Sequence, residues 1–177
     1  MTVQPARPKD SEHSISKRRD SRPSRNALDS SVLIAAHISR AGVCAELLEE
    51  LLLHHELVAS EYILEEITRK LREKFNFPAS DARLVTAFLR RVGIVVAPAE
   101  LPPEICRDPT DLPVLETAVA GQCVLLISVD RDLLDMVSVQ GIPIVRPGEF
   151  WDARLPSTRN AGAKQKPFAE KFIRYSS

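Results

Sequence analysis

The chain has 177 residues, 44% of them hydrophobic and 27% charged, and this length allows one domain of the usual size, about 100 to 150 residues, together with tails. Its three cysteines are far apart, odd in number and without C-x-x-C spacing, which argues against a disulfide framework or a zinc ribbon. The formal net charge is zero and no run approaches the roughly 20 apolar residues of a membrane span, so we expect a cytoplasmic protein with free thiols and no membrane contact.

Both ends of the chain are basic, whereas the middle is acidic. Residues 1–26 hold seven Lys or Arg and three Asp or Glu, and residues 156–177 hold five and one, so each end has a net charge of +4. Residues 27–155 hold twelve basic and twenty acidic residues, a net charge of −8. With few large apolar side chains to offset the entropy of ordering, residues 1–25 are predicted to be a disordered basic tail. Residues 155–177 are interpreted as a basic extension, and both tails are either solvated chain or a weak electrostatic contact to a polyanion such as RNA.

From residue 26 on, short apolar segments alternate with amphipathic helices. In chain order we predict a strand at 26–28, a helix capped by Ser30 or Ser31 and ending near 38, a helix within 43–57, a strand within 56–60, helices at 60–75 and 80–91, a strand within 93–98, a loop at 99–111, a helix at 111–121, a strand at 124–128, a short helix at 131–137, a strand at 142–145 and a turn at 148–151. Uniformly apolar strands that alternate with helices are typical of a parallel sheet with helices on both faces. The predicted fold class is therefore α/β.

Acidic residues lie beside the ends of two of these strands. Asp29 ends the first strand, Asp130 follows the fourth, and Asp111 opens the helix that leads into the fourth. In open parallel sheets, function collects beyond the carboxyl ends of the strands, where the strand order reverses, so we expect these acids to meet there. Glu66 lies about two turns into the helix after the second strand, although Glu65 beside it is equally acidic and a solvated helix face explains either.

A cluster of these carboxylates predicts a bound cation. At a separation of about 4 Å, each pair repels by about 4 kcal/mol at an effective dielectric near 20, which is a large cost for a domain whose total stability is about 10 kcal/mol. Oxygen ligands without His or Cys suit a hard ion, so Asp29, Asp111 and Asp130 are predicted to hold Mg²⁺ or Mn²⁺. Such an ion can activate a water and stabilise the charge of a phosphodiester under attack.

Four segments carry a resemblance to a known family: LDSSVLIAA, SEYILEEITRKL, CRDPTDLPVLETAVAG and LLISVDRDLL. In this order and spacing they resemble the PIN domain, most closely the bacterial PIN proteins that are the toxins of toxin-antitoxin pairs. The resemblance covers about Ala27 to Asp152. It implies a PIN domain at 26–154, with a three-layer fold whose central parallel sheet has about five strands and helices on both faces.

The same resemblance implies a metal-dependent endoribonuclease, the toxin component of a type II toxin-antitoxin system. Its catalytic acids, one from each segment, would be Asp29, Glu66, Asp111 and Asp130. The implied partners are an RNA substrate and a cognate antitoxin protein, with a homodimer as a further option and no membrane.

Four further residues have lesser implied roles: Asp108, Ser128, Asp132 and Ser31. Asp108 and Asp132 fall where this subgroup often has further acids, and Ser128 where it has Ser or Thr beside the site. The subgroup commonly reads Asp-Thr-Asn in the first segment, whereas here Ser31 replaces the amide residue, which keeps a hydroxyl but could alter substrate contacts. A second departure is Pro113, which a first helical turn tolerates and which puts Asp111 at or near the helix cap.

Two other classes of function remain open. The first keeps the fold and the metal pocket in a catalytically silent module that binds RNA or a protein partner. The second is a phosphoryl-transfer protein, and the residues disfavour it. A haloacid-dehalogenase-like phosphatase needs an acid where Ser31 stands, and a receiver domain needs a lysine after a late strand, where none follows 124–128 or 142–145. His54 and His55 end a leucine-rich helix and are expected to lie near its last carbonyls, outside catalysis.

Overall fold

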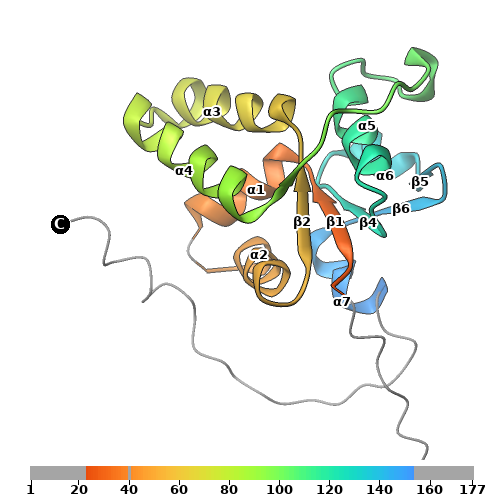
Figure 1. Cartoon of the computed structure of the whole chain (residues 1–177), viewed down its shortest axis with the longest axis horizontal. Coiled ribbons are helices and arrows are strands. Elements are labelled where there is room, and N and C mark those ends of the chain that lie inside the picture. Colours follow the sequence, from red (N-terminus) through yellow and green to blue (C-terminus); the bar gives the residue numbers. More distant parts are fainter. Residues whose placement is uncertain (1–22, 40, 154–177) are drawn as a thin grey trace, which may run out of the picture.

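The structure, a computed structural model, describes residues 23–39 and 41–153 of the chain. The predicted disordered tail lies outside the described residues except for its last three positions, and the predicted extension at 155–177 lies wholly outside them. The described residues form a six-stranded sheet of order β3-β2-β1-β4-β6-β5, with helices on both sides (Figure 1). The predicted α/β fold with a mainly parallel central sheet is therefore confirmed.

The bounds of the elements follow the predicted order closely. The strands are β1 (Arg25–Leu28), β2 (Glu56–Ala59), β3 (Ile94–Val95), β4 (Leu125–Ile127), β5 (Ser138–Val139) and β6 (Ile142–Val145). The helices are α1 (Ser30–Ile38), α2 (Val43–His54), α3 (Glu61–Phe75), α4 (Ala79–Val92), α5 (Leu112–Ala120), α6 (Arg131–Asp135) and α7 (Phe150–Ala153), with 3₁₀ turns η1 (Pro103–Ile105) and η2 (Pro147–Glu149).

Strand β1 lies at the centre of the sheet between β2 and β4, and it is parallel to both. Strand β2 is also parallel to β3, and β4 is parallel to β6. Strand β5 is antiparallel to β6 and forms the edge of the sheet. The sequence did not predict β5, because a strand of two residues shows no periodicity from which it could be recognised.

The core lies between the sheet and its helices. In Figure 1, α1 and α2 lie on one side of the strands, and α5 and α6 lie on the other. Helix α5 packs against β1, β2 and β4, while α3 and α4 pack against each other as a hairpin. Fully buried leucines from both layers fill this interior, among them Leu28, Leu57, Leu115 and Leu126. Burial of each such side chain contributes about 1.5 to 3 kcal/mol.

The ends of three helices show how local sequence sets the boundaries. Ser60 caps α3 as predicted, since its Oγ accepts a hydrogen bond from the Ile63 N–H at 3.4 Å. Asp111 is the residue before α5, also as predicted. The predicted cap of α1 is wrong. Asp29, not Ser30 or Ser31, occupies the N-cap position, and no side chain makes a capping hydrogen bond there.

The strand order reverses between β1 and β4. After β1 the chain builds β2 and β3 on one side, and it then returns to place β4 and β6 on the other. Leu28 and Ile127 are register partners, so the residues that follow these two strands emerge side by side at the carboxyl edge of the sheet. This is where ligands bind in open α/β sheets.

No single helix in the described part of the chain is both long and apolar enough to cross a membrane, although α1 and α2, bent by 103° to each other, together meet the length and composition of a broken span.

Candidate active site

Asp29 is a buried carboxylate at the carboxyl edge, immediately after β1. Its side chain is held by two hydroxyl groups: Oδ1 accepts a hydrogen bond from Ser30 Oγ at 3.3 Å, and Oδ2 accepts one from Ser128 Oγ at 3.2 Å. The Asp29 backbone N–H donates to the carbonyl of Ile127 at 2.9 Å, which ties the end of β1 to the end of β4. Since the carboxylate does not cap α1, its orientation is set by these two serines.

Ser128, Asp130 and Asp132 continue the site from the end of β4. The fully buried Ser128 Oγ accepts a hydrogen bond from the Asp130 N–H at 3.0 Å. Asp130 is the N-cap of α6, and its Oδ1 accepts from the Asp132 N–H at 2.8 Å. Asp132 lies in the first turn of α6 and forms an exposed ion pair of 3.1 Å with Arg107. Of the two acids, Asp130 therefore caps the helix, and its second oxygen is not used in that bond.

Asp111 connects α5 to this group. Burial, followed by the negative charges of Asp130, Asp108, Asp29 and Asp132 in that order, raises the pKa of the Asp111 carboxyl to about 6. Four predicted site acids thus lie close enough to Asp111 to disfavour its charged form. The structure gathers these carboxylates from three separate stretches of the chain: residue 29, residues 108–111 and residues 130–132.

Asp108 differs from the other acids because it shapes its own loop. Its Oδ1 accepts hydrogen bonds from the Thr110 N–H at 2.9 Å and the Thr110 Oγ1 at 2.8 Å, and these bonds lower the pKa of the Asp108 carboxyl. This pattern is typical of an aspartate that stabilises a turn. The turn carries Asp111, so Asp108 supports the position of its neighbour.

Glu66 approaches the group from α3. Its side chain is only 12% exposed, whereas Glu65 beside it is an exposed residue, so burial distinguishes the two acids that the sequence left equivalent. Burial, and then the charges of Glu66 and Asp111, raises the pKa of the Tyr62 phenol, so both acids lie near its ring. Tyr62 Oη also donates to the Thr110 carbonyl at 3.3 Å, which ties α3 to the loop before Asp111.

The structure adds two residues to the site: Ser30, which the sequence named only as a helix cap, and Lys70, which it gave no role. Lys70 Nζ lies 3.0 Å from Glu66 Oε1 and donates a hydrogen bond to the buried Ser30 Oγ at 2.9 Å. Ser30 Oγ in turn donates to Asp29, so one hydroxyl connects the lysine to the central carboxylate. The spacing of Glu66 and Lys70, four residues apart with Glu first, is a sequence signal for such a helical ion pair. Ser31, predicted as a secondary residue, lies next to Ser30, but the hydrogen bonds to Asp29 and Lys70 are made by Ser30.

The donor set fits a hard divalent cation by its chemistry. All its candidate ligands are oxygens, and after burial it is the neighbouring carboxylates that raise the pKa of Asp111, which indicates repulsion that a cation would relieve. Within the described ranges, however, no three His, Cys, Asp or Glu side chains are placed so that one ion could contact them all. Metal binding therefore requires the carboxylates to turn toward a common point.

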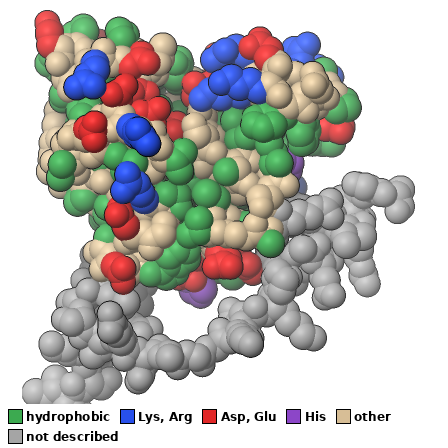
Figure 2. Space-filling view, turned by 180° about the vertical axis from the view of Figure 1, so that it is seen from behind, with side chains coloured by type: hydrophobic (Ala, Val, Ile, Leu, Met, Phe, Trp, Pro, Cys, Tyr) green, Lys and Arg blue, Asp and Glu red, His purple; other side chains and the backbone are tan. Residues whose placement is uncertain are grey.

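The acids lie at an open edge of the molecule. Figure 2 shows a notch at the upper edge between the lobe of α5 and α6 and the lobe of α3 and α4, with blue Lys and Arg side chains gathered over the latter. A cavity of about 600 Å³ lies along α3 and the start of α4, but the acids do not line it. Its charged lining is balanced, with Arg69 and Arg72 facing Glu65 and Glu73, so it shows no preference for an anion.

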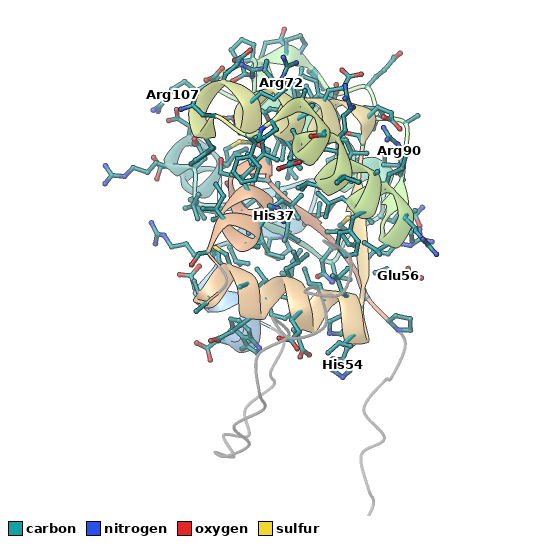
Figure 3. All side chains as sticks on the ribbon, turned by 90° about the vertical axis from the view of Figure 1, so that its left-hand side faces the viewer. His37, His54, Glu56, Arg72, Arg90 and Arg107 are labelled. Carbon is teal, nitrogen blue, oxygen red and sulfur yellow. The ribbon has the colours of Figure 1, made fainter. Side chains whose placement is uncertain are left out.

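The two histidines that the sequence set aside lie far from this edge. His54 pairs with Glu50 at 3.3 Å at the end of α2, just before β2 begins. In Figure 3, His54 lies at the lower end of the molecule and Arg107, the partner of Asp132, at the upper end. His54 and His55 therefore lie at the amino edge of the sheet, the edge at which the parallel strands β1 and β2 begin.

Comparison with known proteins identifies a matching family and a solved structure with a similar fold. A family model described as a PIN domain matches residues 25–132. Among solved structures, that of VapBC2 from Rickettsia felis bound to a DNA fragment from their promoter is similar, with a TM-score of 0.54 and 12% sequence identity over 69% of this chain and 98% of that chain. At this identity the likeness supports the fold alone. No curated protein matches the chain.

Proposed function

The chain belongs to the PIN domain family, whose model matches more than half of it, and from this premise we propose that it is a Mg²⁺- or Mn²⁺-dependent endoribonuclease. Proteins of this family are generally nucleases that use divalent metal ions. The observation that carries the proposal is the gathering of carboxylates around Asp111, which with burial raises its pKa to about 6. A domain tolerates such repulsion where a function requires it.

Asp29, Asp111 and Asp130 are the proposed metal ligands. The ion would neutralise their repulsion, orient an attacking water and stabilise negative charge on the phosphodiester. Ser30 and Ser128 hold the two oxygens of Asp29, so this carboxylate is oriented before a ligand arrives.

The remaining predicted residues take supporting roles in this proposal. Glu66 completes the acid cluster or positions the attacking water. Asp108 stabilises the loop that carries Asp111, and Asp132 connects α6 to that loop through Arg107. Ser31 lies in the first turn of α1, where a hydroxyl stands in place of the amide common in the subgroup, so substrate contacts there would be altered.

We assign the nuclease to the toxin component of a type II toxin-antitoxin system. The similar solved structure contains VapBC2 bound to promoter DNA. The four sequence segments named above resemble those of PIN-domain toxins. The proposed partners are an RNA substrate and a cognate antitoxin, with a homodimer as a further option. Residues 26–154 would form the catalytic domain of a cytoplasmic protein, and the two basic ends, net +4 each, would increase contact with RNA.

The test is cleavage of an end-labelled, mixed-sequence single-stranded RNA by the purified full chain in Mn²⁺, with and without a chelator. We expect cleavage that the chelator abolishes, and a loss of about 100-fold or more in Asp29→Asn and in Asp111→Asn. Glu66→Gln and Glu65→Gln form a matched pair. Substitution of the buried Glu66 should lower the cleavage rate, whereas substitution of the exposed Glu65 should not. Undiminished activity in Asp29→Asn and Asp111→Asn would contradict the proposal.

A second candidate function is a catalytically silent PIN module that binds RNA or a protein partner. It is favoured by the side-chain positions, because Glu66 is paired with Lys70, and Asp130 caps α6. Tight RNA binding that depends on the basic tails, combined with no cleavage in Mn²⁺ or Mg²⁺, would support this alternative.

A further inference from the structure

Lys70 is a partly buried cation that contacts Glu66 and Ser30 beside the acid cluster. Its side chain is 20% exposed, and the carboxylate it contacts, Glu66, is 12% exposed. Arg69 also approaches Glu66, but at 3.9 Å and with a side chain that is 57% exposed. The two neighbouring cations therefore differ in burial and distance while sharing one carboxylate, which makes Arg69 a natural control.

The contacts of Lys70 connect two arms of the site. Its ammonium lies 3.0 Å from Glu66 Oε1 and donates to Ser30 Oγ at 2.9 Å, and Ser30 Oγ donates onward to Asp29 Oδ1 at 3.3 Å. A charge-assisted hydrogen bond of this kind is stronger than a neutral one. One side chain on α3 therefore fixes both an acid on its own helix and, through a serine, the acid after β1.

A positive charge at this position also reduces the attraction of the cluster for any other cation. Like charges repel across several ångströms in a partly buried site, where solvent screening is weaker than at an exposed surface. The same ammonium thus stabilises the acids when no metal is bound and opposes metal binding.

Resting on the proposed function, we propose that Lys70 is a positioning residue that acts as a built-in counter-cation: it holds Glu66 and Asp29 in place without metal, and it weakens the binding of a divalent ion by competing for the same negative charge. The metal affinity of the chain is then set as much by α3 as by the ligands. This residue is distinct from the four predicted catalytic acids.

The experiment measures Mn²⁺ binding to the full chain by isothermal titration calorimetry, using wild type, Lys70→Met, Lys70→Arg and Arg69→Met. We expect Lys70→Met to bind Mn²⁺ about three- to tenfold more tightly. Lys70→Arg keeps the charge and should stay close to wild type, and Arg69→Met should change the affinity by less than about twofold because its charge is solvent-screened.

Thermal unfolding provides a second measurement that does not depend on activity. Without metal, Lys70→Met should melt at a lower temperature than wild type, and saturating Mn²⁺ should raise its melting temperature by more than it raises that of wild type, since a ligand that binds the folded state more tightly stabilises it more. Equal or weaker Mn²⁺ binding by Lys70→Met would overturn the proposal.

The outcomes also separate this proposal from the nuclease assignment. Mn²⁺ binding that strengthens in Lys70→Met, together with no RNA cleavage by any variant, would refute the nuclease and leave the counter-cation intact. Failure of the wild-type chain to bind Mn²⁺ at millimolar concentration would overturn the counter-cation together with the metal-binding part of the proposed function.

Discussion

The two edges of the parallel sheet balance their polar groups in different ways. At the amino edge, where β1 and β2 begin, Arg25 pairs with Glu56 at 3.0 Å and Ser24 Oγ lies 3.3 Å from His55 Nδ1. At the carboxyl edge, where β1 and β4 end, carboxylates gather around Asp111, and its burial together with their negative charges raises its pKa to about 6. The amino edge pairs opposite charges, whereas the carboxyl edge also gathers like charges around Asp111, beside its ion pairs Lys70–Glu66 and Arg107–Asp132.

The difference indicates that the two edges serve different ends. The amino edge combines a matched ion pair with the buried Phe150, which makes edge-on contacts with His55 and Trp151 at centroid distances of 6.1 and 5.5 Å. The carboxyl edge keeps unfavourable repulsion that a better-packed surface would lack. Proteins retain such local cost at functional sites, where removal of the strain also removes the activity.

The largest expected effect is loss of the aromatic anchor of the amino edge. Phe150 is 1% exposed, so Phe150→Ala should lower the free energy of unfolding by about 3 to 5 kcal/mol, measured by urea denaturation. Leu84→Ala, which removes a side chain that is 69% exposed, is the matched control and should change it by less than about 0.5 kcal/mol. A small effect of Phe150→Ala would show that the amino edge is not the stabilising one.

At the carboxyl edge, a substitution is expected to raise the free energy of unfolding instead of lowering it. The pKa of Asp111 is about 6 in the folded chain against an ordinary 3.8, so the folded state binds the proton more tightly and loses stability as pH rises from about 4 through 6. Asp111→Asn removes that loss. After allowance for solvent screening of this half-buried group, it should raise the free energy of unfolding at pH 7 by about 1 kcal/mol without metal.

The pH dependence gives a sharp check of this prediction. The advantage of Asp111→Asn should be full above about pH 6 and vanish below about pH 4, where the wild-type carboxyl is protonated in both states. Glu100→Gln, at an exposed position, should show no such trend. If Asp111→Asn is less stable than wild type at pH 7 in chelator, the carboxylates do not repel as the structure implies.

The smallest effect is expected from the ion pair of the amino edge. Arg25 and Glu56 have side chains that are 43% and 37% exposed, so Glu56→Gln should lower the free energy of unfolding by only about 0.2 to 1 kcal/mol. The difference in the free energy of unfolding between wild type and variant should become smaller from low to high salt, because salt screens the ion pair. A loss that persists at high salt would mean that Glu56 acts through packing instead.

Much of the fold could be predicted because its information is local. Apolar runs and helical stripes mark the long elements, and Ser60 and Asp111 mark the starts of two helices. The mainly parallel sheet with helices on both faces was also implied by the resemblance of four segments, in one order, to the PIN domain. The two-residue strand β5 was not predicted, because its conformation depends on pairing with β6 and the local sequence does not indicate that pairing.

Less of the candidate site could be predicted, because side-chain contacts depend on how distant elements pack. Sequence could nominate acids that follow strands, but it could not tell that Asp130 accepts the capping bond or that Ser30 joins Lys70 to Asp29. These contacts join residues up to 40 positions apart. The contacts from Lys70 through Ser30 to Asp29 depend on the angle at which α3 meets the end of β1, and neither segment alone predicts that angle.

The position of β4 also bears on when the site can exist during synthesis. This strand is inserted next to β1, the earliest strand among the described residues. About a hundred residues separate the two along the chain, as the spacing of 99 between Asp29 and its contact Ser128 shows. A nascent or proteolytically shortened chain that stops before Leu125 lacks Asp130 and Ser128, and it leaves β1 as an open edge. The ribosome must therefore nearly finish the domain before Asp29, Asp111 and Asp130 can lie close together.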